Sequence, residues 1–322
     1  MISLGVLFAV LASVVYGLSD VVSGTVVRRY STASLALWAQ VTGLLVLGAA
    51  VAVRRPELSG PAVAWGLGAG AVGAVGVLAF YTALQRGRTS VVTPVAGAGV
   101  ILPVLFGILA GESLGWRSGL GVVAAAVGII VVAAAPEDAT PVLEPVLAGH
   151  PVPGRTQPVP TYDGCVPAAR PGSGRSSLVF AVLAALAFGV FFILLEQATD
   201  GGRPSGADQA AFDVALVVAV AVQLGALAVT LLAATRHTRA CLSPGRSLAF
   251  PAIGVGLLDV GADLLVTLAV DLGPLAVVGP LASLDPVVAV LFATVVLRER
   301  VHRVTAIGVV VALLGIVLVA TG

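Results

Sequence analysis

Four aspartates lie in stretches of sequence that are otherwise apolar. Asp259 and Asp263 are four residues apart in GLLDVGADLL (256–265), so both carboxyls would lie on one face of a helix. Asp285 lies in the next apolar stretch along the chain, and Asp20 lies in the first one. Two carboxyls one helical turn apart bind protons as a coupled pair. Because a proton and a solute can alternate on one carboxyl of such a pair, these residues predict a site for solute and protons.

The apolar stretches that hold these acids contain no arginine, and the chain contains no lysine. A charged side chain at the centre of a bilayer costs at least ~2.5–3.5 kcal/mol. We therefore expect the aspartates to face the protein interior or a water-filled cavity. Their partner would be a proton, a metal cation or a cationic solute. The alternative is that each aspartate is protonated and hydrogen-bonded to a neighbouring helix.

Several neutral side chains are candidates for hydrogen bonds to a solute. Hydrogen bonding between helices is the alternative role for each of them. The candidates are Gln40, Tyr81 and Ser283, followed by Tyr16 and Gln223.

Glutamates that occur at matching positions in both halves of the chain have a different predicted role. Glu112 and Glu299 each follow a long apolar stretch, so we assign them to the ends of helices. A backbone N–H or an arginine is the partner that we expect for such a carboxylate.

The remaining motifs exclude several classes of protein. Cys165 and Cys241 lack metal-site spacing, and no histidine pairs in sequence with a buried acid. The motifs of serine hydrolases, zinc metalloproteases and P-loop ATPases are absent. The net charge of +1 provides no basic face for nucleic acid. We therefore predict no catalytic residue, no metal site and no cofactor, and we expect no enzyme.

Composition identifies the elements that must position the acids. Hydrophobic residues make up 58% of the 322 residues and charged residues only 10%, whereas soluble domains carry about 25% charged residues. A helix needs about 20 apolar residues to cross a bilayer, and ten stretches meet this length. We predict an all-α polytopic membrane protein with spans near residues 2–27, 32–53, 61–84, 89–110, 116–135, 176–196, 210–234, 247–270, 274–297 and 304–320.

The chain repeats itself. FAVLA occurs at 8–12 and at 180–184, and GRTSVVTP (87–94) matches GPLAVVGP (273–280) further along. The halves are therefore two copies of one five-helix unit. Because five is odd, the second copy must enter the membrane upside down, which is the construction of secondary transporters.

The repeats define the predicted domains. The first five-helix repeat covers residues 1–135 and the second covers residues 176–322. Residues 136–175 contain nine prolines, and such a segment cannot bury enough apolar surface to become ordered. We expect it to be an extended or disordered tether, and a regulatory or partner-binding segment is the alternative.

Prolines interrupt corresponding spans of the two repeats. Pro94 and Pro280 are equivalent, and Pro103 and Pro286 add a second predicted break to each span. A proline removes a backbone hydrogen bond, and matching interruptions in two halves point to a transport site. The alternative is that these prolines kink the helices without contacting a ligand.

The sequence resembles the EamA-like branch of the drug/metabolite transporter superfamily over the whole chain except the proline-rich segment. The resemblance implies a ten-helix carrier that moves small metabolites, amino acids or drug-like solutes, often outward and often coupled to protons. The motifs that carry it are YGLSDVVSG (16–24), SVVTP (90–94), GLLDVGADLL (256–265), PLASLDPVVAVLFATVVLRER (280–300) and GVVVALLGIVLVA (308–320).

Together these features predict a secondary transporter that exports a small organic solute by proton exchange or facilitated diffusion. The site would lie between the repeats, lined by the four aspartates. A membrane-embedded lipid-handling protein and a non-transporting accessory subunit are the alternatives. We expect a small-molecule solute and protons as partners, within the lipid bilayer, for a monomer or a homodimer.

We expect a multi-pass protein of the cell membrane with both termini on one side, because the number of spans is even. The loops that share the side opposite the termini contain 13 arginines and the other loops four. The positive-inside rule then places both termini outside the cytoplasm. The resemblance implies cytoplasmic termini instead, so the orientation stays open.

Overall fold

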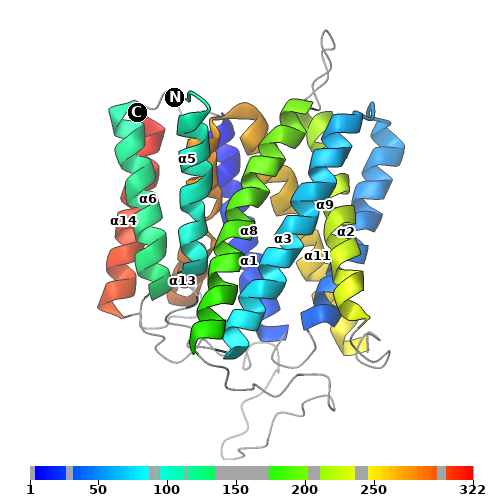
Figure 1. The fold of residues 1–322 in the computed structure, drawn as a ribbon, viewed down its shortest axis with the longest axis horizontal. Helices are drawn as coiled ribbons and strands as arrows, with labels where there is room; N and C mark the ends of the chain where they lie inside the picture. Colours follow the sequence, from blue (N-terminus) through cyan, green and yellow to red (C-terminus); the bar gives the residue numbers. More distant parts are fainter. Residues whose placement is uncertain are drawn as a thin grey trace, which may run out of the picture.

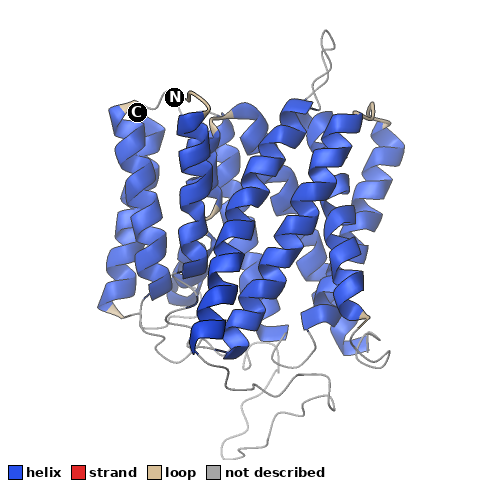
Figure 2. Cartoon of the chain, in the orientation of Figure 1, coloured by secondary structure: helices blue, strands red, loops and turns tan. Residues whose placement is uncertain are grey.

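The computed structural model describes residues 4–26, 32–86, 92, 95–112, 115–134, 174–201, 211–235, 246–295 and 302–321. Within these ranges the chain is helical, with short turns and no strand (Figures 1 and 2). In lipid, a helix satisfies its backbone hydrogen bonds within one segment, which explains why apolar runs adopt this form. The elements are α1 (Leu4–Val26), α2 (Thr32–Arg54), α3 (Gly60–Arg86), η1 (Ala98–Val100), α5 (Ile101–Leu109), α6 (Trp116–Ala134), α8 (Gly174–Gly201), α9 (Ala211–Ala234), α11 (Arg246–Leu272), α12 (Leu275–Ala282), α13 (Asp285–Val295) and α14 (Arg303–Thr321).

The predicted ten membrane helices are confirmed. Seven apolar helices of the described chain have at least 18 residues, and three shorter ones complete the set. α12 and α13 together form one of the seven. The predicted fold class, an all-α membrane protein of two inverted five-helix repeats, is therefore correct.

The two repeats interlock. The first helix of one repeat packs along the third helix of the other, so that α1 lies beside α11 and α8 lies beside α3. The last helices, α6 and α14, pack on each other. α1 begins and α14 ends at the same end of the bundle, which we call the termini end (Figure 1).

Equivalent glycines make the same close contact in both halves. A Cβ at Gly17 of α1 would lie 2.9 Å from the carbonyl oxygen of Asp285. A Cβ at Gly189 of α8 would lie 2.8 Å from the carbonyl oxygen of Gly99. Both glycines therefore bring a helix backbone against the interrupted span of the other repeat, which places that span's residues next to α1 or α8.

The GLGAG sequence of α3 also serves helix packing. A Cβ at Gly66 would lie 2.7 Å from the Cβ of Ala221 on α9, and Gly70 faces the backbone of Val222. Small residues let backbones approach in lipid, where packing drives helix association. This contact joins the third helix of the first repeat to the second helix of the other.

The interrupted span of the second repeat breaks after Pro280 rather than at it. Pro280 lies inside α12, which ends at Ala282, and Ser283 has φ −89° and ψ 19°. α13 then begins at Asp285, so Pro286 occupies the first turn, where its missing N–H breaks no helical bond. The break predicted at Pro280 therefore needs correction, because the helix continues past that proline.

The first repeat has a matching irregularity. The 3-10 turn η1 leads directly into α5, and Pro103 lies buried in the first turn of α5. Pro94 and Glu299 lie outside the described residues, as do residues 136–173 of the predicted tether.

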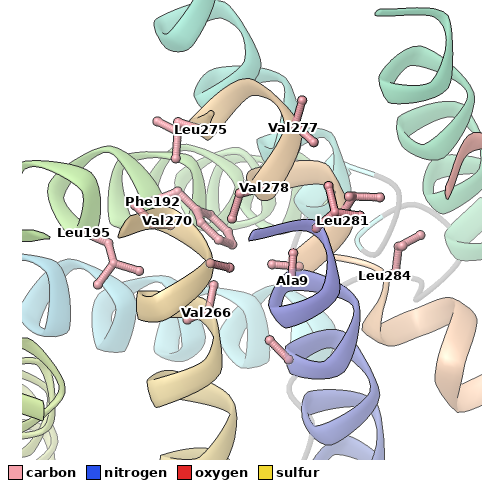
Figure 3. Close-up of a cluster of buried hydrophobic side chains, with 14 of the residues drawn as sticks. Ala9, Phe192, Leu195, Val266, Val270, Leu275, Val277, Val278, Leu281 and Leu284 are labelled. Atoms are coloured by element: carbon pink, nitrogen blue, oxygen red, sulfur yellow. The ribbon is translucent and has the colours of Figure 1, made fainter. Parts of the chain in front are cut away.

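An apolar cluster fills the bundle between α1, α8, α11 and α12 near the termini end (Figure 3). Its location follows from the antiparallel contact of α1 and α11, because a Cβ at Gly5 would lie 3.0 Å from Gly273. The start of α1 therefore meets the end of α11. We call this cluster the apolar plug; it contains Ala9, Phe192, Leu195, Val266, Val270, Val278 and Leu281.

Candidate functional site

Two hydrogen bonds join α1 to the aspartates of α11. The Tyr16 hydroxyl donates to Oδ1 of Asp263 at 2.6 Å, and the Ser19 hydroxyl donates to Oδ1 of Asp259 at 2.5 Å. The spacing of three residues on α1 and four on α11 places each pair on facing sides of the two helices. The predicted sharing of one helix face by both aspartates is therefore seen, and that face points to α1.

The other two aspartates meet beside this pair. The carboxyl groups of Asp20 on α1 and Asp285 at the start of α13 lie within hydrogen-bonding reach of each other. An ionised carboxylate only accepts hydrogen bonds, so a bond between two carboxyls requires a proton on one of them. The two carboxyls belong to helices of different repeats and can share a proton in this position.

None of the four aspartates is fully buried. Asp20 is exposed, and the other three aspartates are half-buried. Each carboxyl lies within hydrogen-bonding reach of a side chain of another helix, so each contacts a neighbouring helix of the bundle. Along the chain, the apolar plug lies between them and the termini end.

No described arginine or histidine is hydrogen-bonded or ion-paired to any of the four carboxyls. Among the described residues, no group of three acids, histidines or cysteines is arranged to hold a metal ion. The carboxyls of Asp259 and Asp263 repel each other when both are ionised. The arrangement therefore has the capacity to bind protons or a cationic group.

The other half of the bundle has apolar residues at the position that is equivalent to the aspartate site. Phe191 of α8 lies against Gly73 of α3, where a Cβ would come within 3.1 Å of its ring. Phe188 lies against Gly76 in the same way, at 3.0 Å. The counterpart of Asp259 is thus a glycine that receives a phenylalanine ring, and the acidic site occurs once.

Three other predicted site residues, Ser283, Gln40 and Gln223, form no hydrogen bond with any of the four carboxyls in the described part of the chain. The Ser283 hydroxyl donates to the carbonyl of Gly279 at 2.9 Å, within its own helix. Gln40 lies on α2, and its buried Oε1 has no hydrogen-bond partner. Gln223 is buried on α9 beside Gly43 of α2. The side chain of Tyr81 lies outside the described residues.

Sequence reasoning missed Ser19. The available signal was its spacing, because Ser19 follows Tyr16 by three residues and directly precedes Asp20. All three polar side chains then fall on one stripe of α1.

Glu112 has the kind of partner that the sequence predicts. Its Oε1 accepts the backbone N–H of Leu275 at 2.6 Å, and its Oε2 accepts that of Ala276 at 2.9 Å. These are the first residues of α12, so the carboxylate of one repeat binds a helix start in the other.

An arrangement of ten apolar helices in two inverted repeats, with ionisable groups at their interface, is typical of secondary transporters. The model of the EamA-like transporter family matches residues 3–134 and 175–321. The chain belongs to the EamA-like transporter family, and it is a membrane transporter.

Comparison with solved structures supports the fold. One of them, described as "Crystal structure of protein", covers 98% of this chain and 95% of its own with a TM-score of 0.67. The two sequences are 17% identical, so the likeness concerns the fold alone. Comparison with the curated proteins gives no match.

Proposed function

We propose that this transporter exports a small organic solute by alternating access, and that the four aspartate carboxyls bind protons and solute. The observation that carries the proposal is the convergence of Asp20, Asp259, Asp263 and Asp285 without a cationic side chain among the described residues. The carboxyls favour a solute that carries an amine or another cationic group.

The hydrogen bonds of the site support coupling between binding and movement. Tyr16, Ser19 and Asp20 belong to the first repeat, whereas their three partners belong to the second. A solute or a proton that takes over one of these carboxyls replaces a bond between the repeats. Binding therefore changes the free energy of one repeat rocking against the other.

Transport by proteoliposomes, with and without a pH gradient, tests the proposal. Solutes for the assay come from a thermal-shift screen of candidate amines and amino acids on the purified protein. Asparagine resembles a protonated aspartate in shape and charge. If the carboxyls carry only protons, Asp259→Asn and Asp285→Asn lose gradient-driven transport but keep solute–solute exchange. If they also bind solute, both activities are lost.

Asp213→Asn is the matched control, because Asp213 pairs with Arg54 at 2.9 Å near a helix end and away from the cluster. We expect its transport to equal that of the parent. Normal gradient-driven transport in folded Asp259→Asn and Asp285→Asn would remove the aspartates from the mechanism. If the unsubstituted protein transports equally well without a pH gradient, the mechanism is facilitated diffusion.

A further inference from the structure

The start of α12 has no capping group in its own sequence. The first N–H groups of a helix lack partners within the helix. The residue before the helix is Pro274, which forms no side-chain cap. All eight residues of α12 are buried, so water cannot satisfy these groups. A partner must come from elsewhere in the chain.

Glu112 supplies that partner with both of its carboxylate oxygens, which accept the N–H groups of Leu275 and Ala276. A negative charge at a helix start is stabilised by the helix dipole. The backbone around Glu112 holds the carboxylate in this position. The Glu112 N–H donates to the carbonyl of Gly107 at 3.0 Å, and Gly111 has φ +95°, which favours glycine.

Gly107 makes room for the contact. A Cβ at this position would lie 2.8 Å from Cδ of Glu112 and 2.9 Å from the backbone nitrogen of Ala276. Any larger residue would therefore displace the carboxylate or the helix start.

This contact joins the repeats at the termini end. α5 belongs to the first repeat and α12 to the second, and 163 residues separate Glu112 from Leu275. α12 also supplies Val278 and Leu281 to the apolar plug (Figure 3). In an alternating-access cycle that opens the termini end, α12 would have to leave the plug, and the carboxylate would oppose that movement.

We propose that Glu112 is a gating residue, which holds α12 in the position that closes the termini end. The proposal rests on the alternating access proposed above, but it concerns a carboxylate outside the aspartate site. Its test measures accessibility and needs no solute, so it can fail while the proposed transport function stands.

The test follows a cysteine placed in the plug. Ala9 is fully buried there, and Ala9→Cys is made with Cys165→Ser and Cys241→Ser, which remove both native cysteines. The full chain is placed in lipid nanodiscs, where both faces are accessible. A charged, membrane-impermeant methanethiosulfonate reagent then labels the cysteine only when water reaches it.

We expect Glu112→Gln to raise the labelling rate on the order of tenfold, as for the loss of hydrogen bonds to a charged group. Gly107→Ala should raise it as well, because it displaces the same contact from the opposite side. Two controls at the same end should leave the rate unchanged. Asp200→Asn removes an exposed acid, and Gly115→Ala adds a methyl group where nothing lies within 4 Å.

Folding is checked by size-exclusion elution and thermal unfolding in each variant. If Glu112→Gln does not fold, Gly107→Ala decides the question. A labelling rate equal to that of the parent in the folded variants would overturn the gating role. Equal increases in the two controls would also overturn it, because the effect would then not depend on the carboxylate contact.

Discussion

Substitution of Gly121 by alanine tests the packing of α6 against α14. A Cβ at Gly121 would lie 2.7 Å from the carbonyl oxygen of Gly315 and 2.8 Å from the backbone nitrogen of Val319. Ordinary van der Waals contact begins at 3.4 Å. Because both obstacles are backbone atoms, they cannot rotate away, and alanine must separate the helices by about 0.7 Å in a closely packed interface.

The cost of this separation follows from the contacts that it loosens. A radial gap of 0.5–1 Å removes about a quarter to a half of the attraction between a pair of atoms. Overpacking of this kind typically costs about 1–3 kcal/mol. Alanine favours a helix over glycine by about 1 kcal/mol. We therefore expect Gly121→Ala to lower the free energy of unfolding by up to about 2 kcal/mol.

Gly119→Ala is the matched control, since Gly119 lies two residues away on α6 and a Cβ added there would meet no atom within 4 Å. Here only the helix preference remains, and the free energy of unfolding should stay level or rise by about 1 kcal/mol at most. Denaturant-induced unfolding of the two purified variants and the parent in one detergent measures the difference. A Gly121→Ala protein as stable as Gly119→Ala would refute the packing argument.

Two further substitutions test individual polar contacts. Arg54→Gln removes the ion pair with Asp213. Because the Arg54 side chain is 48% exposed, the free energy of unfolding should change by less than about 1 kcal/mol. This difference between variant and parent should disappear in 1 M salt. Ser177→Ala removes the buried 3.0 Å hydrogen bond to the carbonyl of Ala83, which joins α8 to α3. It should destabilise the protein by about 0.5–1.5 kcal/mol, whereas Thr235→Ala, which loses an exposed local bond, should have a smaller effect in the same measurement.

The membrane helices and their inverted arrangement could be predicted because each depends on a property that sequence displays directly. The length of an apolar stretch determines whether it crosses a bilayer. Because each repeat has five helices, an odd number, the second repeat must be inverted relative to the first. The face shared by Asp259 and Asp263 is also a local property, set by their spacing of four residues. What faces them is not local, because Ser19 and Tyr16 lie 240 and 247 residues away.

The break in the ninth span shows where local reasoning fails. Pro280 removes one helical hydrogen bond, but α12 is buried on all sides and packing holds it helical through that position. The helix ends where Ser283 leaves helical dihedral angles, a change that no single residue type signals. Likewise, a backbone N–H partner for Glu112 could be expected from sequence, but its identity depends on how α5 meets α12.

Interlocking of the repeats has a consequence for how the protein is made. α1 ends at Val26, while its neighbour α11 begins at Arg246, about 220 residues later. At about 5–20 residues per second, the ribosome takes on the order of 10–40 s to reach the second of these helices. During that interval Asp20 is in the nascent first half without Asp285. A chain truncated after the first half would keep this acid without its partner on α13.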